Sequence, residues 1–81
     1  MTREELVAKT NEILADEFEV EIEDIQPDGD IKKTLELDSL SIVDMVALIE
    51  ETFGVKILGT EVSKIKTFDA LYDFILEKVN A

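Results

Sequence analysis

The chain contains no cysteine and no histidine among its 81 residues, so its fold has to be stabilised by packing alone. Neither a disulfide nor a cysteine-based metal site can reinforce a core that is near the lower size limit for independent folding. Apolar residues make up 46% of the chain and recur in short periodic groups, which is typical of a globular domain and not of a disordered segment. We therefore expect one compact domain over residues 1–81.

Helical periodicity dominates the sequence. A capping box at residues 2–5 precedes the first periodic segment, Asp38 or Ser39 can cap the second before Gly54 ends it, and Thr67 can cap the last. The predicted main helices are residues 3–17, 38–53 and 67–79, and a short turn or helix covers residues 59–65. We expect an all-α fold, a small four-helix bundle of three main helices plus one short helix with a long first loop.

That first loop is predicted over residues 18–37. From Asp16 to Asp30 the chain has eight acidic residues and no basic one, and Pro27-Asp28-Gly29 marks a turn. The apolar side chains expected to pin the loop to the core are Phe18, Val20, Ile22 and Ile25. The alternation of the first three also fits a short strand, although no clear second strand exists to pair with it.

The excess of acidic residues also restricts the possible partners. Twenty acidic and eight basic residues give a net charge of −12, which argues against nucleic acid as a partner and favours basic proteins. No apolar run approaches the roughly 18 residues of a membrane span, and we expect no signal peptide. We expect a cytoplasmic protein without a membrane span, and the highly charged surface favours a monomer.

Ser39 is the first candidate functional residue. It lies in the sequence Asp38-Ser39-Leu40-Ser41 at the start of the predicted second helix. A serine hydroxyl acts as a nucleophile only when a base takes its proton, and the chain has no histidine for that task, no cysteine and no glycine-rich phosphate loop. We therefore expect that the protein is not an enzyme and that another enzyme modifies Ser39.

The predicted second helix has more apolar surface than one core stripe requires. The core stripe consists of Ile42, Met45, Val46, Ile49 and Phe53. A second arc consists of Leu40, Val43 and Ala47, with Asp44 and Glu51 on one flank and Glu50 on the other. Either neighbouring helices bury both arcs, or the second arc is a docking surface for a basic, partly apolar partner. We favour docking because the arc begins beside Ser39. Leu48 falls on neither arc and is expected to be a single exposed apolar residue.

The segment from Leu37 to Ile57, LDSLSIVDMVALIEETFGVKI, resembles the modification site and recognition helix of acyl carrier proteins. Residues 25–28 and 64–68 resemble the same family before and after this segment. The resemblance implies that Ser39 is the attachment point of 4′-phosphopantetheine, which a phosphopantetheinyl transferase transfers from coenzyme A. The terminal thiol of this arm would carry acyl groups as thioesters. Asp38 would support recognition by the transferase, a role compatible with capping the helix.

The resemblance also implies a docking face and a space for the cargo. The residues that would face basic patches on acyl transferases and synthases are Leu40, Val43, Asp44, Ala47, Glu50 and Glu51. The core positions that would line the space for an acyl chain are Leu6, Ile42, Val46, Ile49, Phe53, Phe68, Leu71 and Ile75. A peptidyl or D-alanyl carrier, whose arm holds an aminoacyl group, remains an alternative within the carriers.

Four departures from the family pattern bear on the pathway. Glu36 stands where the family usually has glycine, Ser41 replaces a common acid, Leu58-Gly59 stands where Pro-Asp is common, and Phe68 is bulkier than the usual valine. None of them removes a group that the attachment chemistry needs. Fatty-acid biosynthesis and a specialised acyl or polyketide pathway therefore both remain open.

A calcium-binding protein is the remote alternative from another class. Residues 24–31 partly fit an EF-hand loop, with acids at its first, fifth and seventh positions and glycine at its sixth. However, the twelfth position is Leu35 and not the usual bidentate glutamate, and Pro27 stiffens the loop.

Overall fold

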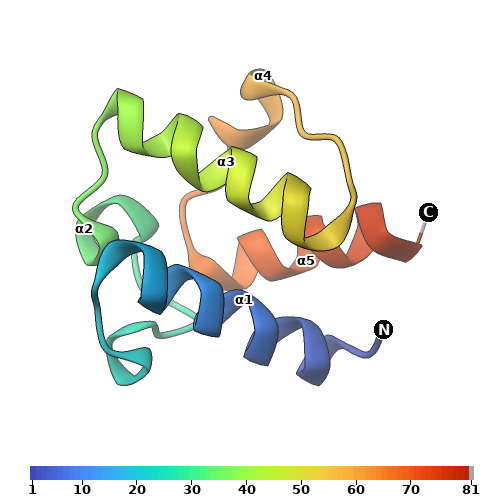
Figure 1. Ribbon diagram of the computed structural model, residues 1–81, viewed down its shortest axis with the longest axis horizontal. Helices are drawn as coiled ribbons and strands as arrows, with labels where there is room; N and C mark the ends of the chain where they lie inside the picture. Colours follow the sequence, from blue (N-terminus) through green and yellow to red (C-terminus); the bar gives the residue numbers. More distant parts are fainter. Residues whose placement is uncertain (81) are drawn as a thin grey trace.

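The computed structural model describes residues 1–80, and these residues form five α-helices and one short 3₁₀ helix (Figure 1). The elements are α1 (Arg3–Phe18), η1 (Ile22–Asp24), α2 (Ile31–Leu35), α3 (Ser39–Phe53), α4 (Gly59–Val62) and α5 (Phe68–Asn80). Within residues 1–80 there is no strand, and a single isolated bridge joins Asp30 to Thr67. The expected all-α bundle is confirmed. In the same part of the chain, no helix has both the length and the apolar character needed to cross a membrane.

The first helix begins where the capping box predicts. The Thr2 hydroxyl accepts a hydrogen bond from the Glu5 amide at 3.2 Å, and the Glu5 carboxylate accepts one from the Thr2 amide at 3.1 Å. These two bonds satisfy amide groups that the first turn leaves without partners. The helix ends one residue later than predicted, at Phe18, where Glu19 takes a left-handed conformation with φ of 54°.

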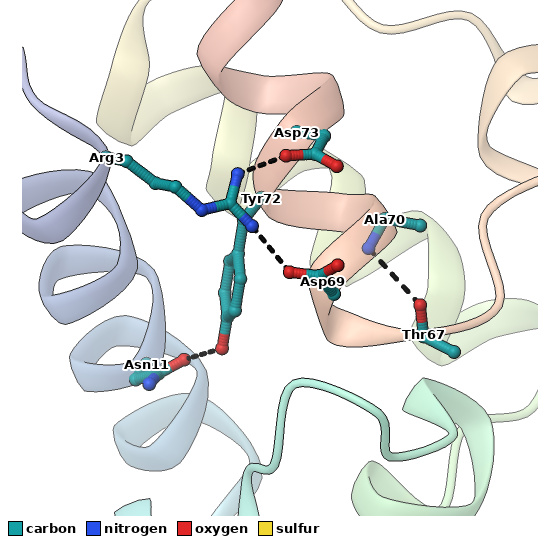
Figure 2. A network of polar contacts seen from close by, with 7 residues as sticks. All are labelled: Arg3, Asn11, Thr67, Asp69, Ala70, Tyr72 and Asp73. Carbon is teal, nitrogen blue, oxygen red and sulfur yellow. Dashed lines mark hydrogen bonds and ion pairs between the residues drawn. The ribbon is translucent and has the colours of Figure 1, made fainter.

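Polar contacts join α1 to α5, which lie alongside each other in Figure 1. Figure 2 shows Arg3 donating hydrogen bonds to the carboxylates of Asp69 and Asp73, and the Tyr72 hydroxyl donating to the side-chain oxygen of Asn11. The Arg3–Asp69 bond measures 2.5 Å. Both carboxylates lie beside the Arg3 guanidinium, so they raise the pKa of that group. The start of α1 is thereby fixed against the first half of α5.

The segment between α1 and α3 is not the uninterrupted loop that the sequence predicts. It contains η1 and α2, and its backbone is tied to the start of α5 because the Asp69 amide donates to the Pro27 carbonyl at 2.8 Å. Ile25 is buried, and Phe18 and Val20 are half-buried against the core, as expected. Ile22 is 51% exposed, so its predicted role in pinning the loop is wrong.

The core lies between α1, α3 and α5, with contributions from the shorter elements. Its least exposed apolar side chains are Leu6, Leu14, Met45, Ile49, Phe68, Leu71, Tyr72 and Ile75. Leu48, expected to be exposed, is half-buried against this core. Tertiary packing therefore covers a residue that lies outside the predicted core stripe of its helix.

The chain ends and the start of α3 lie at opposite ends of the molecule. In Figure 1 the beginning of α1 and the end of α5 both lie at the right, whereas the light-green first turn of α3 lies at the upper left. The longest dimension of the molecule, 30 Å, is horizontal in this view. The first turn of α3 is therefore well separated from both ends.

Candidate functional site

Asp38, and not Ser39, caps α3. Its backbone is extended, and its carboxylate accepts a hydrogen bond from the Ser41 amide at 2.8 Å. This bond favours the ionised carboxyl and lowers the pKa of Asp38 below its usual value. The sequence left both residues as possible caps, and the structure assigns this role to the aspartate.

Ser39 is consequently the first residue of the helix and is free of the capping role. Its side chain is exposed, and within residues 1–80 its hydroxyl forms no hydrogen bond. The positive end of the helix dipole lies at this turn, which favours an anionic group attached there. The geometry therefore accommodates a phosphodiester on the Ser39 oxygen.

The chain enters α3 through a constrained turn. Glu36 follows α2 and has φ of 53°, a left-handed conformation, and its amide donates to the carbonyl of Lys32 within that helix. The Leu37 amide also donates to this carbonyl, at 3.0 Å. These bonds fix the residues immediately before Asp38 and Ser39.

The second apolar arc of α3 is exposed. Leu40 and Val43 have 77% and 63% of their surface accessible, and Ala47 is exposed as well. This result excludes burial of both arcs by neighbouring helices. We call Leu40, Val43 and Ala47, together with the exposed acids Asp44 and Glu51, the α3 strip.

Glu50, the other acid assigned to the docking face, has a role within the fold. It is only half exposed, and its carboxylate accepts a hydrogen bond from the Ile57 amide at 2.8 Å. This contact ties the segment after α3 back onto the helix. Glu50 therefore differs from Asp44 and Glu51, whose carboxylates make no hydrogen bond or ion pair within residues 1–80.

A groove of about 340 Å³ lies beside the α3 strip, between α3 and α4. Its lining residues are Lys32, Ile42, Val43, Val46, Gly59, Val62 and Ser63. Of the eight residues predicted to line a cargo space, only Ile42 and Val46 do so. Leu6, Ile49, Phe68, Leu71 and Ile75 are instead fully packed in the core, and the half-buried Phe53 does not line the groove either.

Sequence reasoning missed the groove residues outside α3. Lys32 lies on α2, Gly59 and Val62 lie in α4, and Ser63 directly follows α4. No periodic pattern connects residues so far apart in the chain, because the tertiary packing of three helices brings them together. The one available signal was the apolar Val62 within a short predicted element.

The acidic first loop does not form the calcium site considered as an alternative. Within residues 1–80 no group of three or more acidic side chains is arranged to hold a metal ion. The Asp30 carboxylate, at the seventh position of the EF-hand pattern, caps α2 by accepting from the Lys33 amide at 3.0 Å. Asp24 belongs to η1, and Pro27 and Gly29 bond through their carbonyls to the start of α5.

Comparison with known proteins gives a consistent result. Residues 10–75, which include Ser39, match the family described as the phosphopantetheine attachment site. The chain is 36% identical over 81 residues to an acyl carrier protein of Rubrobacter xylanophilus and 37% identical over 81 residues to one of Thermosynechococcus vestitus, and both alignments cover 100% of each chain.

A solved structure agrees with these relatives. The acyl carrier protein from Enterococcus faecalis superposes with a TM-score of 0.79 at 33% identity, covering 96% of this chain and 99% of that one. Such proteins are carriers and not enzymes, and their cofactor is a covalently bound 4′-phosphopantetheine. The chain belongs to the acyl carrier protein family.

Proposed function

We propose that Ser39 is the residue that carries the 4′-phosphopantetheine of this carrier. The observation that supports this assignment most strongly is the exposed, unbonded Ser39 hydroxyl at the first position of a helix that Asp38 already caps. Since Asp38 satisfies the Ser41 amide, modification of Ser39 leaves the cap intact.

The groove supports the second part of the proposed function, which is to shelter an acyl cargo. When bound, the cofactor supplies a thiol that holds acyl groups as thioesters. Ile42, Val43 and Val46 lie within the two helical turns after Ser39 and form one wall of the groove, while Val62 contributes to it from α4. These side chains favour apolar segments of a cargo because contact with them removes apolar surface from water.

The first prediction concerns attachment. Incubation with coenzyme A and a broad-specificity phosphopantetheinyl transferase should add one phosphopantetheine to the wild-type chain and none to Ser39→Ala. Intact-mass spectrometry measures the addition. Ser41→Ala is the matched control, since it removes a hydroxyl from the same turn while keeping the amide that bonds to Asp38. An unmodified wild type, or a modified Ser39→Ala, would refute the assignment.

We further propose that the α3 strip docks the transferase and the acyl transferases and synthases that act on the cargo. An apolar strip with acids at its edge suits partners that present lysine and arginine around an apolar centre. Such charges accelerate encounter more than they prolong binding, which suits a carrier that visits several enzymes in turn. The carboxylates of Asp44 and Glu51 are available for these contacts, whereas that of Glu50 is engaged with Ile57.

The second prediction tests this docking surface by charge reversal. Asp44→Lys should lower kcat/KM for transferase modification by roughly two- to tenfold, because an attraction to the partner becomes a repulsion. Glu12→Lys on α1 is the control, as it changes the net charge equally at another exposed position. Steady-state kinetics at low and moderate salt measure the effect. Equal losses in the two variants would assign the effect to net charge and not to the strip.

A further inference from the structure

A small polar cavity adjoins the apolar groove. It has a volume of about 30 Å³, and its lining residues are Asp30, Lys32, Ser63, Ile65 and Lys66. Lys32 and Ser63 line the groove as well, so the two cavities share one boundary. We call the small cavity the lysine niche.

Two lysines give the niche its charge. Within residues 1–80 the ion pairs involve only Arg3 and Lys78 as cations, so neither Lys32 nor Lys66 is paired with a carboxylate. Asp30 is the one acid that lines the niche, and its carboxylate already accepts from the Lys33 amide. The niche therefore has a net positive charge in a chain whose overall charge is −12.

The backbone around the niche is held in place. The Ile31 amide donates to the Lys66 carbonyl at 2.9 Å, and the bridge between Asp30 and Thr67 lies beside it. The start of α2 and the segment before α5 are thus joined directly. The Ser63 hydroxyl donates to the Thr60 carbonyl at 2.8 Å, whereas the side chains of Lys32 and Lys66 form no hydrogen bond or ion pair within residues 1–80.

We propose that the groove and the niche together favour a short acyl chain whose far end bears a carboxylate. The middle of the chain would lie against Ile42, Val46 and Val62, and its carboxylate would pair with Lys32 and Lys66. At about 30 Å³ for each water-sized group, the groove holds roughly ten non-hydrogen atoms, which suits a six-carbon diacid better than a long fatty acyl chain. This inference rests on the proposed attachment of the arm to Ser39.

The test compares two cargoes of equal length. Adipyl and hexanoyl groups are loaded from their coenzyme A thioesters with a broad-specificity transferase, and intact mass confirms loading. Cleavage of each thioester by hydroxylamine then reports how well the protein shelters it. The quantity of interest is the protection of adipyl divided by that of hexanoyl, because this ratio cancels general effects on the arm.

Three substitutions locate the effect. We expect the protection ratio to fall about two- to fivefold in Lys32→Met and in Lys66→Met, as for the loss of a partly exposed ion pair. Lys33→Met is the matched control, because it removes an identical charge from α2 at a residue that lines neither cavity. Circular dichroism confirms that each variant keeps its helices. In the wild type, the amide NMR signals of Ser63 and Lys66 should shift more with adipyl than with hexanoyl.

An identical ratio in the wild type and in Lys32→Met and Lys66→Met, or an equal fall in Lys33→Met, would overturn the proposal. Failure of both cargoes to load would contradict the attachment to Ser39 and not the niche. Binding of a carboxylate in the niche is then tested separately. Free N-acetylcysteamine thioesters of the two acids are titrated onto the unmodified chain at millimolar concentration, and the amide NMR signals are followed. Equal perturbation of Ser63 and Lys66 by both thioesters would again reject the niche.

Discussion

At the scale of single residues, Glu36 connects an unusual sequence position to a structural requirement. The resemblance to acyl carrier proteins implies glycine here, and the structure gives the physical reason, since the residue has φ of 53°. A left-handed conformation brings Cβ close to the following carbonyl oxygen, so it costs a residue other than glycine about 1–2 kcal/mol. Glu36 therefore strains the turn that positions Asp38 and Ser39, although the sequence alone identified only the departure and not its backbone cost.

The third prediction follows from this strain. Glu36→Gly should raise the free energy of unfolding by roughly 0.5–1 kcal/mol, after part of the relieved strain is offset by the greater freedom of glycine in the unfolded chain. Urea denaturation measures the change. Glu36→Gln is the control, because it removes the charge but keeps a side chain at the left-handed position. An equal gain in both variants would attribute the effect to charge.

At the scale of elements, strong local signals predicted the long helices, whereas of the short ones only α4 was expected and η1 and α2 were missed. The first and second main helices match α1 and α3 to within one residue, because caps and apolar spacing agree at both ends. In contrast, α2 has only five residues, too few for periodicity, and depends on the Asp30 cap and on the contact of Ile31 with Lys66. The predicted element 59–65 is likewise too short for periodicity to define its end, and α4 ends at Val62.

The residues of the candidate site were also only partly predictable from the sequence. Ser39, Asp38 and the exposed residues of the α3 strip could be identified from one helix and its cap. The groove and the lysine niche could not, since their walls come from three separate elements. A pattern along one helix contains no information on which lysine of α2 faces that helix.

The fourth prediction concerns the cap of α3. Since the Ser41 amide lowers the pKa of Asp38, ionisation of this carboxyl stabilises the fold. That contribution is complete above the unfolded pKa of about 3.9 and is lost as the pH falls through the lower folded value. The difference in unfolding free energy between wild type and Asp38→Asn should therefore change between about pH 5 and pH 2. Denaturation at several pH values measures it, and a constant difference would contradict the prediction.

At the scale of the whole molecule, repulsion among the acidic side chains outweighs attraction between opposite charges. Twenty acids and eight bases occupy a body of 30 × 25 × 21 Å, and the ion pairs of residues 1–80 involve just two of the bases. The Debye length at 0.01 M salt is about 30 Å, so at this ionic strength charges across the entire molecule interact. Near 0.15 M it falls to about 8 Å, and most of these interactions are screened.

The fifth prediction is a rise in melting temperature with salt. We expect Tm to increase by several degrees between about 0.01 M and 0.2 M NaCl, because screened repulsion outweighs the weakened contact of Arg3 with Asp69 and Asp73. Calorimetry or circular dichroism measures Tm. Glu12→Lys, which is less negative, should gain less. A Tm that does not respond to salt would show that self-repulsion contributes little.

The separation of the chain ends from the first turn of α3 has a practical consequence. An affinity tag, a fluorophore or a solid support joined before α1 or after α5 would lie on the side of the molecule away from Ser39 (Figure 1). The carrier could then be immobilised through either end while the first turn of α3, which begins at Ser39, stays on the side away from the support. Enzymes that flow across such a surface would meet carriers attached at the same end. The amount of each enzyme that binds could then be compared between carriers loaded with different cargoes.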